Sequence, residues 1–247
     1  MEAASSSAQR TGERAPLGGL LPVVALLALA AGCETRAGER GVAGTSSGNR
    51  PVTAAAADSE LSFGSVGPFA LVSQTGERVT DADLAGRPWV LSCIYTTCHG
   101  PCPEVSASMA DVQDRLADVD VRLVSISVDP ARDTPEVLAR YAQSLGADPE
   151  RWLFLTGEES AVHALVRDGF HLAVQRAPGD KPILGQQVSH DRRLVAVDAQ
   201  GRVRGYYGSE REEDLDRLEG RMRFLVAEAG ASADAETGDG PDAPSRP

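Results

Sequence analysis

"SCIYTTCHGPCPEVSASM", residues 92–109, contains the change of pattern that decides the fold of this chain. It begins inside "RPWVLSCIY", residues 87–95, a run of apolar and β-branched residues that is typical of a buried strand. After Pro103 the apolar residues recur at spacings of four, three, four and three, which predicts a helix with one buried face: Val105, Met109, Val112, Leu116 and Val119. A strand therefore leads directly into a helix, with Cys98 and Cys102 at the junction.

Strand-like and helix-like patterns continue to alternate after this junction. The expected elements are a buried strand at 121–128, a helix from Thr134–Pro135 to Gly146, a strand at 151–155, a helix with a capping box of Thr156 and Glu159, and a short strand at Phe170–Val174.

Two hairpins and a last helix complete the set of expected elements. Residues 68–80 and 192–207 each indicate two strands joined by a turn at a glycine. Ser209 and Glu212 have capping-box spacing ahead of a final amphipathic helix.

This order of elements predicts an α/β fold, a mixed central sheet with helices on both faces. The domain is expected to span residues 61–228. In such sheets functional residues gather at the carboxyl ends of strands, where Cys98 and Cys102 would lie.

Residues 1–33 have the features of a signal peptide. Arg10 and Arg14 precede the apolar run "PLGGLLPVVALLALAAGC", which is too short for a comfortable membrane span. Its end, "LALAAGC", resembles a bacterial lipobox, which would make Cys33 the lipid-bearing first residue of the mature protein. Ala30 stands where the lipobox usually has leucine, so an uncleaved anchor and ordinary secretion stay open as alternatives.

The segments on either side of the domain lack large apolar residues at any regular spacing. Residues 34–60 have the composition of a flexible tether, and residues 229–247 that of a disordered acidic tail. The expected location is the outer face of a bacterial cytoplasmic membrane, where disulfides can form. The net charge of −12 argues against a nucleic-acid partner, because binding phosphates requires a basic surface.

Cys98 and Cys102 are the candidate reactive residues. Pro101 and Pro103 stiffen the loop that holds them, and the start of a helix lowers a cysteine pKa below its free value of about 8.5. Two such thiols can form a structural disulfide, exchange with another disulfide, or bind a soft metal ion. The pair alone does not decide among these uses.

Three separated motifs, in this order, resemble the Sco/SenC family: "YTTCHGPCP", "SVDPARDTP" and "SHDRRLVAVD". The resemblance implies a thioredoxin-like fold and a Cu(I) site formed by Cys98, Cys102 and His190. It also implies that the protein is a metallochaperone, which delivers copper to the binuclear copper centre in a subunit of cytochrome c oxidase. Asp191 stands where the family commonly has serine, a change beside the histidine that leaves the three ligands in place.

Other functions stay open. Cys98 and Cys102 could instead be the redox pair of a thiol:disulfide oxidoreductase that reduces the cysteines of the copper-site target, so whether the protein is an enzyme is undecided. A structural zinc site would require a fourth donor, for which His99 is the candidate. A peroxidase-like activity is a further alternative and would require measurable peroxide turnover.

Several other residues of suitable chemistry are expected to have structural roles. Cys93 and Met109 fit a buried strand and a helix face. His163 and His171 fall within a helix pattern and an alternating strand pattern, and neither is expected to be a ligand. Asp129 follows a buried strand and is expected near the cysteines, either as a turn residue or as an electrostatic influence on the thiols.

Overall fold

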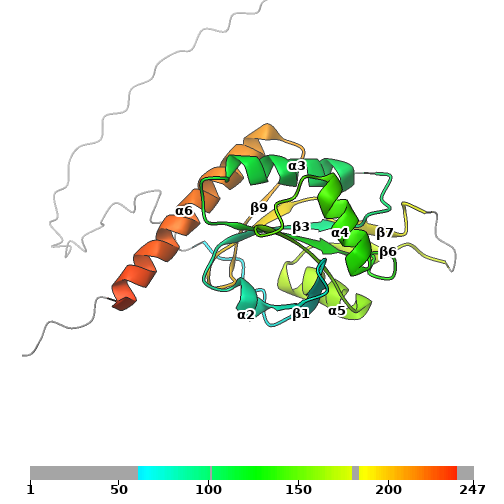
Figure 1. Ribbon diagram of the computed structural model, residues 1–247, viewed down its shortest axis with the longest axis horizontal. Coiled ribbons are helices and arrows are strands. Elements are labelled where there is room, and N and C mark those ends of the chain that lie inside the picture. Colours follow the sequence, from blue (N-terminus) through cyan, green and yellow to red (C-terminus); the bar gives the residue numbers. More distant parts are fainter. Residues whose placement is uncertain (1–60, 101, 180–183, 238–247) are drawn as a thin grey trace, which may run out of the picture. The chain divides into compact units, whose positions relative to one another are not determined.

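The computed structural model describes residues 61–100, 102–179 and 184–237, and its core is a mixed sheet (Figure 1). Within these residues the sheet has the strand order β2-β1-β5-β4-β3-β8-β9. The strands are β1 (Ala70–Ser73), β2 (Arg78–Thr80), β3 (Trp89–Ile94), β4 (Arg122–Ser127), β5 (Trp152–Thr156), β8 (Leu194–Val197) and β9 (Val203–Tyr207). The expected signal peptide with Cys33 and the expected tether, residues 34–60, lie outside the described residues.

The centre of the sheet is parallel and its edges are antiparallel. Strand β4 pairs in parallel with both β3 and β5, whereas β1 and β8 run antiparallel to their neighbours β5 and β3. All six residues of β3 are buried, because helices cover the sheet on both sides of this strand. The expected mixed sheet is therefore confirmed.

Helices lie on both faces of the sheet (Figure 1). One face carries α3 (Cys102–Arg115), α4 (Pro135–Ser144) and α6 (Glu212–Thr237), whose apolar residues form one core cluster with the strands. The other face carries α2 (Asp81–Leu84), α5 (Glu159–Ala164) and a π-helical turn, Leu165–Gly169, in a second cluster. No helix within the described ranges is long and apolar enough to cross a membrane.

A small second sheet consists of β6 (Val174–Arg176) and β7 (Val188–His190), which pair antiparallel. The strand expected at Phe170–Val174 was wrong, because only Val174 belongs to a strand. The apolar alternation there arises from the end of the π-helical turn, where Phe170 and Leu172 are buried and His171 adopts a left-handed φ of 51°. A turn that buries every second residue produces the same pattern as a strand.

Both expected capping boxes were also wrong. Helix α5 begins at Glu159, and its N-cap is Glu158, whose carboxylate accepts a hydrogen bond from the Ala161 amide at 2.9 Å. Thr156 is instead the last residue of β5. The Ser209 hydroxyl has no hydrogen-bond partner among the described residues and does not cap α6.

The last helix is longer than the sequence suggests. It continues to Thr237, so the first nine residues of the segment expected to be disordered, 229–237, are helical. The alanine-rich sequence of this segment has a high helix propensity, which composition-based reasoning about disorder overlooked. Residues 238–247 lie outside the described residues.

Candidate metal site

Cys98 and Cys102 lie at the carboxyl end of β3, as expected. Cys98 follows the strand in a turn whose amide donates to the Tyr95 carbonyl at 3.3 Å, and Cys102 is the first residue of α3. Cys102 is fully buried, whereas the side of the loop carrying Cys98 borders a cavity of about 300 Å³. Both thiols are free in this structure.

His190, the third expected ligand, lies against Cys102. Its Nε2 atom is 3.0 Å from the Cys102 sulfur, although the two residues are 88 positions apart in the chain. Its Nδ1 atom is 2.7 Å from the Asp191 carbonyl oxygen, which can only accept a hydrogen bond. Nδ1 therefore carries the proton, and Nε2 of the neutral ring presents a lone pair to the sulfur.

The surroundings favour the neutral imidazole. Burial holds the pKa of His190 below its ordinary value, against the opposing effect of the Asp191 carbonyl. A neutral imidazole, fixed through its other nitrogen by a backbone carbonyl, is the form in which histidine binds metals. Asp191 thus contributes its main-chain oxygen, while its carboxylate pairs with Arg193 at 2.7 Å.

The two thiols differ in acidity. Burial opposes ionisation of Cys98, yet the neighbouring Cys102 thiol and Tyr95 hydroxyl, together with backbone amides, hold its pKa below the ordinary value. The pKa of Cys102 is raised, chiefly by burial and also because it is the donor to Cys98. Cys98 is therefore the thiol that ionises first.

Tyr95 connects the two sides of the site. Its hydroxyl donates to the Gly185 carbonyl at 2.7 Å, and its ring packs edge-on against His190 with ring centroids 5.7 Å apart. The pKa of Tyr95 is raised by burial and by the neighbouring Cys98. One side chain at the end of β3 therefore contacts both the loop of Cys98 and the segment that carries His190.

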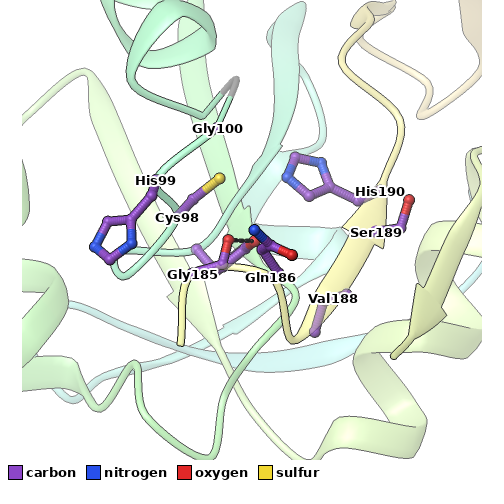
Figure 2. Close-up of a pocket in the computed structure, with 9 residues that line it drawn as sticks. Cys98, His99, Gly100, Gly185, Gln186, Val188, Ser189 and His190 are labelled. Atoms are coloured by element: carbon purple, nitrogen blue, oxygen red, sulfur yellow. Dashed lines mark hydrogen bonds between the residues drawn. The ribbon is translucent and has the colours of Figure 1, made fainter. Parts of the chain in front are cut away.

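Cys98 and His190 face each other across the cavity, and the ring of His99 turns to the other side of the loop (Figure 2). The three expected donors meet in pairs, Cys98 with Cys102 and Cys102 with His190. In the part of the chain that is described, no group of three or more Cys, His, Asp or Glu side chains is arranged so that it could hold a metal ion as it stands.

His99 is exposed and packs against Gly185. A Cβ atom on Gly185 would lie 2.6 Å from the His99 ring, and φ at this glycine is +85°, so a larger residue is excluded there. Neither His163 nor His171 lies in the site. The Nε2 atom of His163 is 2.9 Å from the Val128 carbonyl, and His171 is exposed beyond the π-helical turn.

The residues expected to have structural roles are buried. Cys93 and Met109 are fully buried in β3 and α3, and burial raises the pKa of Cys93 to about 12. Asp129 is also fully buried and forms ion pairs with Arg132 at 3.0 Å and with Arg176 at 3.3 Å. It lies at the same edge of the sheet as the cysteines, as expected.

Sequence reasoning missed three residues around the site: Tyr95, Asp133 and Gln187. Asp133 accepts hydrogen bonds from Thr96 and Ser127, and burial raises its pKa despite these bonds. Its position at the end of "SVDPARDTP" was a usable signal, as was the position of Tyr95 in "YTTCHGPCP". Gln187 lies in a stretch without any recognisable pattern.

Comparison with known proteins places these motifs in a family. The SCO1/SenC family model matches residues 58–222, about two thirds of the chain. The chain belongs to the SCO1/SenC family. It is 33% identical to the SCO1 protein homolog of Bacillus subtilis over 149 residues, 59% of this chain and 75% of that protein. It is 36% identical to Protein SenC of Rhodobacter capsulatus over 134 residues, 53% and 58% of the two chains.

Solved structures of this family share the fold. A SCO1/SenC family lipoprotein from Bacillus anthracis is 30% identical, with a TM-score of 0.60 over 66% of this chain and 95% of that chain. BsSco, described with a disulfide switch and as a member of the Sco family of cytochrome c oxidase assembly proteins, is 29% identical, with a TM-score of 0.58 over 67% and 95%. ScoI of Bradyrhizobium japonicum with copper bound is 26% identical, with a TM-score of 0.52 over 65% and 98%. The expected thioredoxin-like fold is confirmed.

Proposed function

We propose that this protein is a metallochaperone that binds Cu(I) through Cys98, Cys102 and His190 and delivers it to the binuclear copper centre of cytochrome c oxidase. The observation that carries the proposal is the 3.0 Å contact between the Cys102 sulfur and the His190 Nε2 lone pair. Disulfide exchange requires no imidazole at that position, whereas a soft metal ion uses both atoms as ligands.

The chemistry of the donor set supports Cu(I) as the cargo. Two sulfurs and one imidazole nitrogen are soft or intermediate ligands, which suit Cu(I) better than a hard cation. His99, the candidate fourth donor of a structural zinc site, borders the cavity, but its ring packs against Gly185 and is turned away from His190 (Figure 2). A site with only three protein ligands suits an ion that is bound and later released.

The family relationship supports the destination of the copper. One similar structure holds copper, and another belongs to a protein described as a cytochrome c oxidase assembly factor. Residues 1–33 and the similarity to a family lipoprotein support an extracytoplasmic protein that is anchored to the membrane, with Cys33 as the lipid site. From there the domain would meet the copper-site subunit of the oxidase, its proposed partner.

A second candidate function is extracytoplasmic thiol:disulfide exchange, which the unequal acidity of the two thiols favours. Cys98, with its lowered pKa, would attack a disulfide of the target and form a mixed disulfide. Cys102 would then lose its proton and attack the Cys98 sulfur, which releases the second target thiol. Two electrons pass to the target, and an external thiol must reduce the new Cys98–Cys102 disulfide.

A copper titration separates the two functions. The reduced full-length protein is titrated with Cu(I) against a competing chelator, together with His190→Ala and the control His171→Ala, which removes an exposed histidine outside the site. We expect one bound Cu(I), with the affinity of His190→Ala reduced by at least about tenfold, since even loss of an outer-shell partner costs that much. The control should bind as the wild type does.

The same variants are tested for reduction of a disulfide substrate. Retained exchange activity in His190→Ala, together with weakened copper binding, supports the chaperone. Copper affinity that is equal in the wild type and His190→Ala would contradict it and favour the oxidoreductase.

A further inference from the structure

The segment that carries His190 is not held by the main sheet. Among the described residues, β6 and β7 pair with each other and with no strand of the seven-stranded sheet. Sheet pairing therefore does not determine how far His190 lies from the cysteines. Its distance from them depends on the short connection, residues 191–193, to β8 and on side-chain contacts between this hairpin and the edge of the sheet.

Gln187, directly before β7, makes the most deeply buried of these contacts. Its side chain is fully buried, and its Nε2 atom donates to the Thr97 hydroxyl at 2.6 Å and to the Asp129 carboxylate at 3.1 Å. The carboxylate can only accept, so the nitrogen of the amide must face it. Both amide protons are therefore used in fixing the hairpin to two different segments.

Both of these segments belong to the sheet edge where the cysteines lie. Thr97 directly precedes Cys98, and Asp129 follows β4, which pairs in register with β3 up to Ser127 and Ile94. Asp129 is itself paired with Arg132 and with Arg176, the last residue of β6 in the same hairpin. Gln187 therefore contacts one residue just after β4 and one residue on the loop of Cys98.

We propose that Gln187 is a positioning residue that sets the distance between His190 and the cysteines. The inference rests on the proposed function, because it concerns the same three copper ligands. Gln187 does not border the cavity itself, since its amide is directed to Thr97 and Asp129. It acts by holding the loop of Cys98 and the start of β7 in one arrangement.

If Gln187 had a purely structural role, its replacement would be expected to change the stability of the fold rather than the position of His190. The Oε1 atom of Gln187 is buried and has no hydrogen-bond partner among the described residues, so the side chain carries an unfavourable burial term. Methionine has a similar length and has no such unpaired oxygen. Asp129 would keep its ion pairs with Arg132 and Arg176. Gln187→Met should thus leave the fold intact and change the position of His190.

The first test is a double-mutant cycle on Cu(I) affinity. The full-length reduced wild type, Gln187→Met, His190→Ala and the double variant are titrated with Cu(I) against a chelator. The control is Gln175→Met, the same substitution at an exposed position of the same hairpin. We expect Gln187→Met to weaken binding about tenfold, the effect of one strong hydrogen bond. In the His190→Ala background the same change should cost less than about twofold.

The second test requires no copper. The Tyr95 ring packs edge-on against the His190 ring, so the imidazole proton resonances of His190 report their relative position. We expect these resonances to shift in metal-free Gln187→Met and to stay in place in Gln175→Met. Unchanged resonances would overturn the positioning role, whatever the copper affinities are.

The outcomes distinguish this inference from the proposed function. If His190→Ala weakens copper binding and Gln187→Met does not, Gln187 has no positioning role and the copper site stands. If neither variant changes the affinity while the His190 resonances shift in Gln187→Met, the positioning role stands and the copper site fails. An equal loss from Gln187→Met in both backgrounds would mean that it does not act through His190.

Thr97→Val provides a second variant in case Gln187→Met does not fold. It removes the hydroxyl that accepts from Gln187 at 2.6 Å, at a half-buried position, and nearly preserves the side-chain shape. We expect the same His190 resonances to shift, by less than in Gln187→Met because the contact with Asp129 remains. No shift in Thr97→Val would also overturn the inference.

Discussion

The Cys102 sulfur and the His190 Nε2 atom lie 3.0 Å apart. The sulfur stands at the first residue of α3, and the nitrogen at the last residue of β7. The contact joins helix α3 to the small hairpin, which has no strand pairing with the main sheet in the described residues. The His190 lone pair and the Cys102 thiol are therefore brought together without a covalent bond and without strand pairing.

The acidities of the three described thiols predict an order of alkylation. Thiolates react, and the pKa of Cys98 is lowered whereas burial raises those of Cys102 and Cys93. Alkylation of Cys98 should therefore rise with pH at values below about 8.5, the pKa of a free cysteine. We expect peptide mass spectrometry of the reduced protein to find Cys98 modified first. Equal rates at Cys102 would contradict the assigned acidities.

Tyr95→Phe should make Cys98 less acidic. The Tyr95 hydroxyl is one of the groups that lower the pKa of Cys98, and phenylalanine keeps the ring while removing this hydroxyl together with its hydrogen bond to the Gly185 carbonyl. The half-point of the alkylation profile of Cys98 should move to higher pH. Tyr141→Phe is the matched control, because that hydroxyl bonds to Ser106 at 2.8 Å. An unchanged profile in Tyr95→Phe would mean that the other donors suffice.

Burial of His190 predicts a loss of stability in mild acid. Its folded-state pKa is lowered from 6.5, so the unfolded chain binds the proton more readily. The contribution to stability is complete above pH 6.5 and is lost as the pH falls through the folded-state pKa. Urea unfolding should therefore show a smaller loss between about pH 7.5 and pH 5.5 for His190→Gln than for the wild type. An equal loss would contradict the burial of the neutral ring; His171→Gln is the control.

Two arginines that share one carboxylate should differ in their effect on stability. Arg204 is 1% exposed and lies 2.9 Å from Asp198, whereas Arg202 is 45% exposed and lies 2.7 Å from the same residue. Arg204→Met leaves a buried carboxylate without its buried partner and should cost about 3–5 kcal/mol. Arg202→Met should cost about 0–1 kcal/mol. Urea unfolding measures both, and similar costs would contradict the importance of burial.

Elements with a strong apolar period were predictable from the sequence. Strand β3 and helix α3 were located because their periods meet at Cys98 and Cys102. The helix start at Pro135 followed from Thr134, which is the N-cap of α4. These features are encoded by neighbouring residues, so one local stretch is enough to recognise them.

Features for which the local pattern allows two interpretations, or which depend on distant residues, were not predictable in this way. The left-handed φ of His171 ends a π-helical turn, and the pattern around it imitates a strand. The carboxylate of Glu158 caps α5 in place of Thr156, since several nearby side chains compete for one cap. Gln187 became visible only when Thr97 and Asp129 were seen beside it.

The candidate site was predictable in its members and not in its arrangement. The resemblance of three motifs named Cys98, Cys102 and His190, yet it carried no information on the separate hairpin that holds His190. It also did not indicate that the donors meet in pairs rather than as a closed set of three. Such details depend on side-chain packing between segments that are far apart in sequence.

Cys102 carries one thiol proton, and two acceptors contact it, the Nε2 atom of His190 and the sulfur of Cys98. Once Cys98 is a thiolate, the two sulfurs and the His190 Nε2 atom share this one proton. Cu(I) is also univalent, so exchanging the proton for Cu(I) leaves the total charge of the site unchanged. Moving net charge into a buried region is costly, and an exchange that keeps the total charge constant avoids this cost. At the copper site proposed for these residues, one positive charge would replace another, with no net charge gained or lost in the buried surroundings.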